Sequence, residues 1–320
     1  VIPYGVAFKL VTVSGVVTLP ISAWAFGRLS GLRFPGPALL SVAATIFLFD
    51  RSFSIYGGNI ASTLAGEFAF SISLSLAVLA LGFVVKGMRT GGSRGWAALL
   101  LALCGLTHII PAFWAIAVTV LIWLVYSAKE RELWVPIAAF ASIAAGLWSY
   151  TGGGWGMDLE VKYVGLGLVA LGCAILAYLA FEGRHLVRWF LGALPVAGLL
   201  SAFWVLPFFV QRGYLNDMGW EKKVGVDIPN YLFTRAKLDP QLVDSPGITW
   251  LLVGGAAAAL VGLVARNRVA VVLTLSAVVC ALAFWLFPEG RLWNARLLPF
   301  YYLSLLLLIG AGTADAVRAL

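Results

Sequence analysis

Long apolar stretches separated by short polar segments dominate this chain. Each stretch is long enough to approach or cross a hydrocarbon core of ~30 Å at a helical rise of ~1.5 Å per residue. This pattern is typical of membrane-spanning helices rather than of a single soluble core. The apolar runs fall at residues 5–27, 35–50, 67–85, 96–126, 134–151, 164–181, 189–210, 248–265, 269–287 and 297–314.

The run at 96–126 is too long for one ordinary span and is interrupted at Thr107-His108-Ile109-Ile110-Pro111. Proline lacks a backbone N–H and clashes with the preceding turn, so the sequence predicts a kinked helix or a two-helix hairpin here. We favour the hairpin because it gathers the basic loops on one side of the membrane, as the positive-inside rule requires. The basic residues of these loops are Arg28, Arg33, Lys86, Arg89, Arg94, Lys129, Arg131, Arg184, Arg188, Arg266 and Arg268. A single span would place the last four of them outside.

The loops on the other side of a hairpin topology are extracytoplasmic. They cover residues 51–66, 152–163, 212–247 and 288–296. The segment 212–247 is the largest extracytoplasmic loop, and it is too polar to be buried in lipid. We expect it to cap an external cavity. Its polar and aromatic residues include Trp220, Asp227, Asn230, Tyr231, Arg235, Asp239 and Asp244.

Together the runs predict an all-α fold, a polytopic membrane helix bundle with about 10–11 transmembrane helices. No repeat of fixed period and no low-complexity linker divides the chain, so residues 1–320 are expected to form a single transmembrane domain. The hairpin topology places Val1 outside. We therefore expect a fragment that lacks an N-terminal span and the first external loop.

Composition agrees with a cell-membrane, multi-pass protein. Hydrophobic residues make up 62% of the chain and charged residues 11%, with a mean hydropathy of +0.97. The net charge of +8 comes from loop residues that form no basic patch, so membrane lipids rather than nucleic acid are the expected partners. Cys104, Cys173 and Cys280 lie inside apolar runs and are interpreted as small core residues.

Several kinds of chemistry are excluded by the motifs that are missing from the sequence. The chain has two distant histidines and no CxxC pair, so no metal site can be identified. It also has no GxxxxGK[ST] phosphate loop, no GxSxG elbow and no GxGxxG motif between a strand and a helix. ATP-driven transport by this chain alone is therefore not expected.

The first candidate site is the polar segment from Tyr56 to Phe68, which combines a glycine pair, hydrogen-bonding side chains and a carboxylate where a span begins. Polar groups at membrane depth are costly and therefore point to function. Asn59 and Glu67 are candidates for an outward-facing sugar or metal-bridged phosphate site. Ordinary helix capping by Glu67 explains the carboxylate equally well.

The second candidate site is the segment from Glu289 to Tyr302, at the outer membrane interface. It contains Arg291, Asn294 and Arg296 among several aromatic residues. The guanidinium fork matches phosphate oxygens, and aromatic rings suit sugar stacking. An interfacial belt with snorkelling arginines is the alternative, although Arg296 is harder to explain this way because it begins the final apolar run.

His108, within the interrupted run, is the third candidate. A histidine in an apolar run can act as an acid, a base or a hydrogen-bond anchor. It can equally satisfy the broken helix backbone, and the sequence leaves both interpretations open.

Four segments carry a resemblance to a known family. They are GVAFKLVTVSGVVTLPISAWAFGRL, FLFDRSFSIYGGNIASTLAGEFAFSISLSLAVLALG, LTHIIPAFWA and GRLWNARLLPFYYL. They resemble actinobacterial multi-span proteins that are labelled 6-pyruvoyl-tetrahydropterin synthase-related. The soluble pterin synthase binds zinc through three histidines, and this chain has only two, so the label does not describe an activity here. In layout these proteins are similar to GT-C superfamily glycosyltransferases, which use polyprenyl-phosphate sugars.

This resemblance implies an enzyme, a membrane glycosyltransferase that moves a hexosyl or pentosyl group from a polyprenyl-phosphate donor to a cell-envelope glycan or lipid acceptor. The active face would be extracytoplasmic. The catalytic base would be an acidic residue in the first external loop, upstream of Val1. Arg296, with Arg291, would hold the phosphate, while Asn59 and Glu67 would bind sugar hydroxyls or orient a divalent cation such as Mg²⁺ or Mn²⁺. The alternative is a flippase or transporter of lipid-linked sugars without catalytic activity.

Overall fold

The chain folds into a bundle of helices, and its computed structural model describes residues 2–151, 159–214, 223–224, 227–234, 248–288 and 292–320. No strand occurs within these ranges. Among the described residues, eleven helices have thirteen or more residues: α1 (Tyr4–Leu29), α2 (Gly36–Leu48), α4 (Phe68–Thr90), α5 (Arg94–Thr107), α6 (Ile109–Ser127), α7 (Trp134–Thr151), α8 (Leu159–Glu182), α9 (Val187–Val210), α11 (Ile248–Val264), α12 (Arg268–Leu286) and α13 (Leu298–Ala319).

The predicted all-α polytopic bundle is confirmed. In the described residues, seven helical segments are long and apolar enough to cross a membrane, one of which runs through both α8 and α9. Three shorter apolar helices, α2, α5 and most of α11, complete the set. The helices follow the predicted apolar runs because a helix satisfies its own backbone and needs only an apolar surface to sit in lipid.

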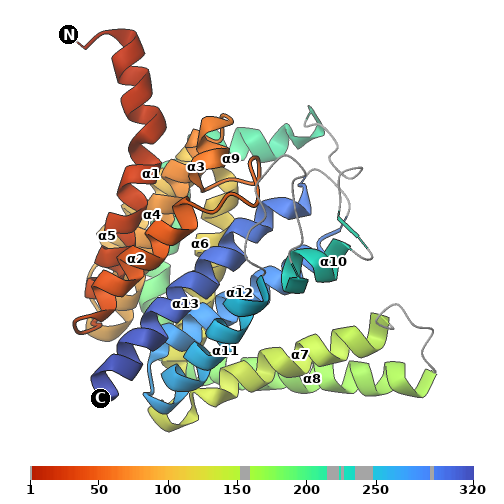
Figure 1. Cartoon of the computed structure of the whole chain (residues 1–320). Coiled ribbons are helices and arrows are strands. Elements are labelled where there is room, and N and C mark those ends of the chain that lie inside the picture. Colours follow the sequence, from red (N-terminus) through yellow and green to blue (C-terminus); the bar gives the residue numbers. More distant parts are fainter. Residues whose placement is uncertain (1, 152–158, 215–222, 225–226, 235–247, 289–291) are drawn as a thin grey trace.

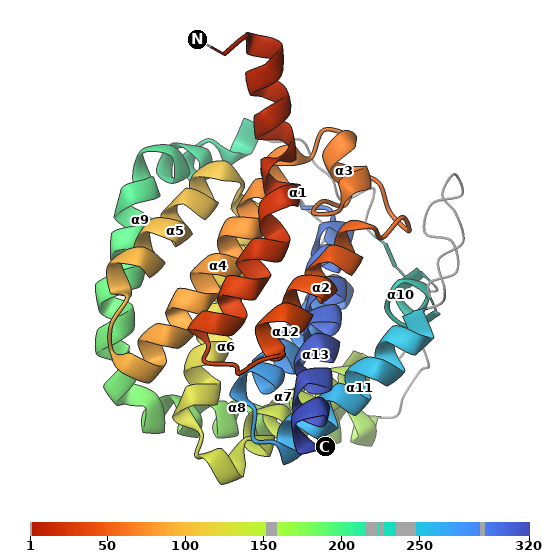
Figure 2. The ribbon, with the colours of Figure 1, turned by 60° about the vertical axis from the view of Figure 1, so that its left-hand side comes forward.

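The interrupted run forms a hairpin, as the loop charges predicted. His108 adopts an extended conformation (φ −161°, ψ 127°) between α5 and α6. The two ends of α6 lie beside opposite ends of α4, since His108 contacts Phe70 and Tyr126 lies within electrostatic reach of Arg89. Helix α6 therefore runs parallel to α4 and antiparallel to α5 (Figure 2).

Hydrogen bonds tie the basic loops together at one end of the bundle. Arg89 donates to the carbonyl of Leu29, Trp189 to that of Gly92, and Arg268 to those of Tyr126 and Ala128. The C-terminus lies at this end, whereas the segment with α3 (Ile60–Leu64) lies at the opposite end (Figure 1). The segregation of basic loops expected from the sequence is thus present in three dimensions.

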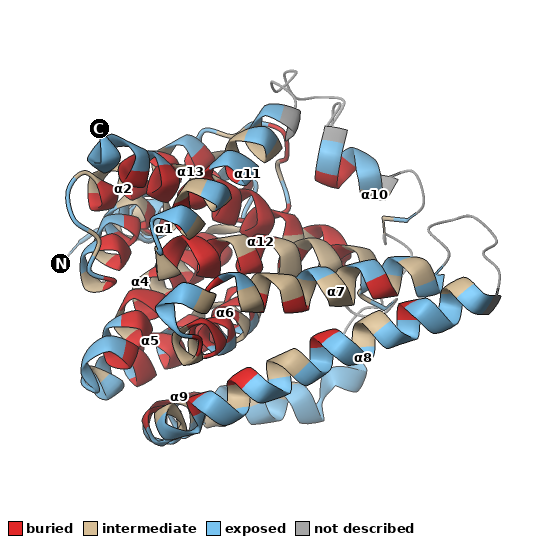
Figure 3. Cartoon of the chain, turned by 90° about the horizontal axis from the view of Figure 1, so that it is seen from below, coloured by how far each residue is buried: buried red, intermediate tan, exposed pale blue. Residues whose placement is uncertain are grey.

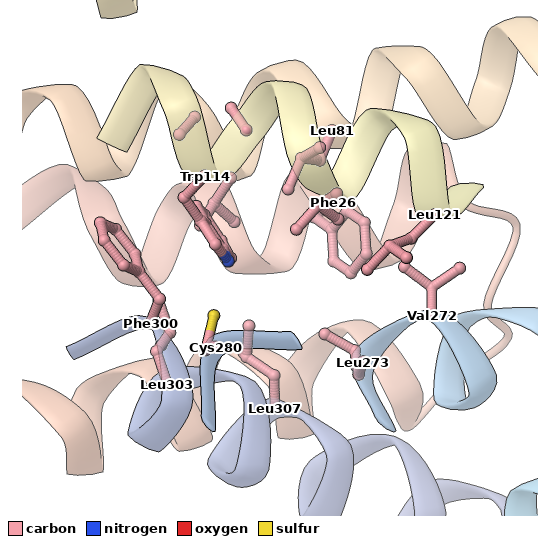
Figure 4. Packing of buried hydrophobic residues seen from close by; sticks show 14 of the residues in the cluster. Phe26, Leu81, Trp114, Leu121, Val272, Leu273, Cys280, Phe300, Leu303 and Leu307 are labelled. Carbon is pink, nitrogen blue, oxygen red and sulfur yellow. The ribbon is translucent and has the colours of Figure 1, made fainter. Parts of the chain in front are cut away.

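Helices α4, α6, α12 and α13 form the buried centre of the bundle (Figure 3). Trp114 of α6 stacks on Phe300 of α13, with ring centroids 5.0 Å apart, and faces Cys280 of α12 (Figure 4). The indole N–H of Trp114 donates to Ser276, whose hydroxyl pairs with Ser304. This layer forms the inner wall of the cavity described below.

Helices α7 and α8 form a hairpin that extends away from this centre (Figure 1). Their backbones approach closely at glycines: a Cβ added to Gly165 would lie 2.7 Å from the carbonyl oxygen of Gly146, and one on Gly172 would lie 2.6 Å from that of Ala139. Small residues of this kind allow membrane helices to pack backbone against backbone.

Candidate functional site

The polar segment between α2 and α4 is held in shape by Asn59. Its amide nitrogen donates to the carbonyls of Asp50 (2.7 Å) and Phe53 (2.8 Å), and its side-chain oxygen accepts from Ser62 N–H, which caps α3. Asn59 is completely buried. Its polar atoms are occupied by the backbone and no surface remains for a ligand, so the geometry gives Asn59 a structural role in place of the expected sugar contact.

Glu67 occupies the N-cap position of α4, but its side chain does not cap the helix. The carboxylate instead pairs with the guanidinium of Arg296, with an Oε1 to Nη2 distance of 2.6 Å. Each side chain is a little over one fifth exposed (23% and 22%), so the pair is neither deeply buried nor freely solvated. The pair therefore joins the two polar segments that the sequence singled out separately.

Arg296 lies in a short 3-10 helix, η7 (Asn294–Leu297), just before α13. Its Nη1 atom is buried and has no hydrogen-bond partner within the described residues. A buried donor without a partner is costly, and in a functional protein it suggests an acceptor that arrives from outside. After pairing with Glu67, Arg296 thus still has an unpaired N–H donor at Nη1.

Asn294 anchors η7 in the same way that Asn59 anchors the other segment. Its amide nitrogen donates to the carbonyls of Lys223 and Phe284, and its oxygen accepts from Lys223 N–H. Only 1% of Asn294 is exposed. It positions Arg296 and does not reach a ligand itself.

His108, in the break between α5 and α6, lies near this ion pair. Its ring packs against Phe70 of α4, with ring centroids 5.2 Å apart, and it lines the same cavity as Leu297. Its Nδ1 accepts from the backbone N–H of Ile110 (3.3 Å), and therefore a neutral ring carries its proton on Nε2. His108 thus both caps α6 and presents a hydrogen-bond donor, so the two roles that the sequence left open coexist.

Beside this polar cluster lies a cavity of about 940 Å³. Its walls come from α6, the end of α9, α12 and the start of α13, and are mostly aliphatic and aromatic. His108, Arg212 and Leu297 belong to its lining, and Leu297 is the chain neighbour of Arg296. Its apolar lining residues include Phe113, Trp114, Phe208, Phe209, Cys280 and Phe300.

Part of the predicted outer loop packs on the same end of the bundle. Tyr231 lies in η6 (Asn230–Thr234), a π-helical turn, and its hydroxyl lies 3.3 Å from that of Tyr56. Tyr301 and Tyr302 of α13 donate to the carbonyls of Leu232 and Tyr231. Four of the other residues that the sequence analysis named in the segment 212–247 lie outside the described residues: Trp220, Arg235, Asp239 and Asp244.

The structure brings together three of the six predicted site residues: Glu67, His108 and Arg296. Arg291 lies outside the described residues. Sequence reasoning missed Arg212 and the parts of the cavity wall that come from α6 and α12, because a wall made from four helices leaves no local motif. The aromatic residues Phe208 and Phe209, just before the outer loop, were the local signal for this wall.

The arrangement suits an amphiphilic anion better than a metal ion. No group of three or more His, Cys, Asp or Glu side chains that could hold a metal occurs in the described part of the chain. Glu67 is already paired with Arg296, and the buried Asn59 cannot join it as a ligand. By contrast, a guanidinium and an imidazole N–H next to an apolar cavity match a phosphate that carries a hydrocarbon chain.

Comparison with known proteins gave no match: no family model, no curated protein and no solved structure matches this chain.

Proposed function

We propose that this protein is a membrane glycosyltransferase that moves a sugar from a polyprenyl-phosphate donor to a cell-envelope glycan or lipid acceptor on the extracytoplasmic face. One observation carries the proposal: Arg296 has a buried, unpartnered Nη1 donor, and its chain neighbour Leu297 lines a cavity of about 940 Å³ with mostly apolar walls. The resemblance in sequence supports the choice of transfer chemistry.

The lipid donor would bind with its two parts in different surroundings. The prenyl chain occupies the cavity, where Phe113, Phe209 and Phe300 offer apolar contact. The phosphate lies at the polar end, where Arg296 and the Nε2–H of His108 donate to its oxygens. Arg212, also in the cavity lining, adds a second positive charge.

In the transfer step, an acceptor hydroxyl oxygen forms a bond to the anomeric carbon as the bond from that carbon to the phosphate oxygen breaks. The electron pair leaves on the phosphate, whose growing negative charge Arg296 stabilises. The acceptor proton passes to a general base. We assign this role neither to Glu67, which is held by Arg296, nor to His108, whose Nδ1 accepts from Ile110.

The test is mass spectrometry of the lipids that co-purify with the wild-type protein and with Arg296→Ala. We expect the wild type to retain polyprenyl phosphate or its sugar ester, and Arg296→Ala to retain at least about tenfold less because charged hydrogen bonds are lost. Arg33→Ala is the matched control, since this exposed arginine belongs to the basic loops at the opposite end. Equal retention by wild type and Arg296→Ala would contradict the proposed phosphate site.

A transfer assay with a labelled sugar donor then separates an enzyme from a transporter. We expect the label to appear on a glycan or lipid acceptor with wild type and not with Arg296→Ala. Donor binding that is accompanied by movement of the lipid across vesicles, without any transfer, would instead identify a flippase.

A further inference from the structure

Glu67 places a negative charge directly at the proposed phosphate site. Its carboxylate lies 2.6 Å from Arg296 and makes no capping bond to α4. A phosphate that approaches the free Nη1 of Arg296 must therefore come close to this carboxylate. A site built only to attract anions would not contain it.

The charged and titratable groups described at this place come from several elements. Arg296 comes from η7, His108 from the break before α6, and Arg212 from η4 (Arg212–Tyr214), just after α9. Lys223 lies beside Asn294, and Cys280 of α12 lines the cavity. Glu67 is the acidic group that acts on His108, and Arg296 is the basic one. The positive charge of Arg296 is thus balanced by Glu67 before any ligand binds.

The donor and the spent carrier differ in charge at the phosphate. A polyprenyl-phosphate sugar is a phosphodiester with a single negative charge. The carrier released after transfer is a phosphomonoester, which carries about −1.5 to −2 at pH 7. Like charges in close contact repel, and the repulsion grows with the charge of the ligand.

We propose that Glu67 is a specificity-determining residue that lowers the affinity of this site for the more highly charged phosphomonoester relative to the singly charged phosphodiester. This inference rests on the proposed function. Repulsion by Glu67 opposes the spent carrier more strongly than the donor, so it favours release of the carrier once the sugar has left. It also explains why a carboxylate lies beside the arginine that binds phosphate.

The experiment measures binding of two probes with the same prenyl chain, polyprenyl phosphate and its methyl ester. The methyl ester is a phosphodiester without a sugar, so it isolates the charge on the phosphate from any sugar contact. In wild type, the ratio of the two affinities reflects both attraction by Arg296 and Arg212 and repulsion by Glu67. In Glu67→Gln, which keeps the size and hydrogen-bonding ability of the side chain, we expect the monoester to gain about tenfold in affinity relative to the methyl ester.

Glu182→Gln is the matched control, because it removes one exposed carboxylate from the other end of the bundle. It should keep the wild-type ratio. If Glu67→Gln does not fold, Glu67→Ala replaces it, and an unchanged ratio in that variant overturns the inference.

The outcomes also separate this inference from the proposed function. Failure of wild type to bind either probe contradicts the lipid-phosphate site itself. Binding of both probes with an unchanged ratio in Glu67→Gln keeps that site and overturns the charge selection. If Glu67→Gln lowers the affinity only for a donor that carries a sugar, Glu67 contacts the sugar. That result would also overturn the charge selection.

Discussion

At the scale of single residues, burial separates polar groups that build the site from those that act in it. Asn59 and Asn294 are almost completely buried, and their side-chain atoms are hydrogen-bonded to backbone groups. Glu67 and Arg296 keep part of their surface exposed, and Arg296 retains an unpartnered donor. A buried amide must be satisfied within the fold, whereas a partly exposed charge remains available to a ligand.

The role of Asn59 can be tested by substitution. Asn59→Ala should lower stability by about 2–3 kcal/mol, because it removes a helix cap and leaves two carbonyls without donors. Asn59→Asp keeps the capping oxygen but faces those carbonyls with a carboxylate, so it should destabilise at least as much. Thermal unfolding in one detergent measures both variants. A wild-type midpoint for Asn59→Asp would show that the two donated bonds do not hold this segment.

At the scale of elements, the ends of helices and their close contacts carry most of the information. The break between α5 and α6 depends on the extended backbone of His108, while Pro111 lies within the first turn of α6, where a missing N–H does no harm. The proline is therefore a helix-start signal rather than a kink. In the α7–α8 hairpin the close contacts depend on glycines, because a residue without a Cβ allows the two helix backbones to approach each other.

Two glycines on α8 provide a matched test of that hairpin. Gly165 is buried against Gly146, whereas Gly167 is exposed with nothing within 4 Å of an added Cβ. Gly165→Val should destabilise the protein by about 2 kcal/mol or more through steric overlap, and Gly167→Val should have little effect. Thermal unfolding compares the two variants.

Lipid retention should survive in Gly165→Val, because no residue of α7 or α8 lines the cavity in the described part of the chain. Loss of the bound lipid in this variant would show that the hairpin supports the cavity indirectly.

At the scale of the whole molecule, charge and polar chemistry separate to opposite ends of the bundle. The basic loops are hydrogen-bonded together at one end, and the Glu67–Arg296 pair lies at the other. The positive-inside rule then predicts that the basic end is cytoplasmic and the candidate site is extracytoplasmic.

Cysteine labelling in intact cells tests this topology. The exposed positions Gly92, Lys129 and Gly213 are each changed to Cys in a Cys173→Ser background, and a membrane-impermeant maleimide is added. Gly213→Cys should react at once, while Gly92→Cys and Lys129→Cys should react only after permeabilisation. Opposite behaviour at positions 92 and 129 would contradict the α5–α6 hairpin, and inverted labelling at all three positions would contradict the assigned orientation.

Much of the fold could be predicted from the sequence, but only part of the candidate site. Glu67, His108 and Arg296 stood out because charged or titratable groups are rare next to apolar runs. Their grouping did not follow, since they lie far apart along the chain. Asn59 and Asn294 stood out as uncharged polar groups beside apolar runs, and only their hydrogen bonds show that they serve the backbone.

The sequence by itself determined the helices and the separation of loop charge, and it favoured the hairpin over a kinked span. These are local properties, because in lipid each span must satisfy its own backbone and present apolar side chains. The tertiary structure alone decided that Glu67 meets Arg296, that His108 faces them, and that four helices leave a cavity beside them. Such features depend on how side chains from distant helices fill the space between them, which no local pattern encodes.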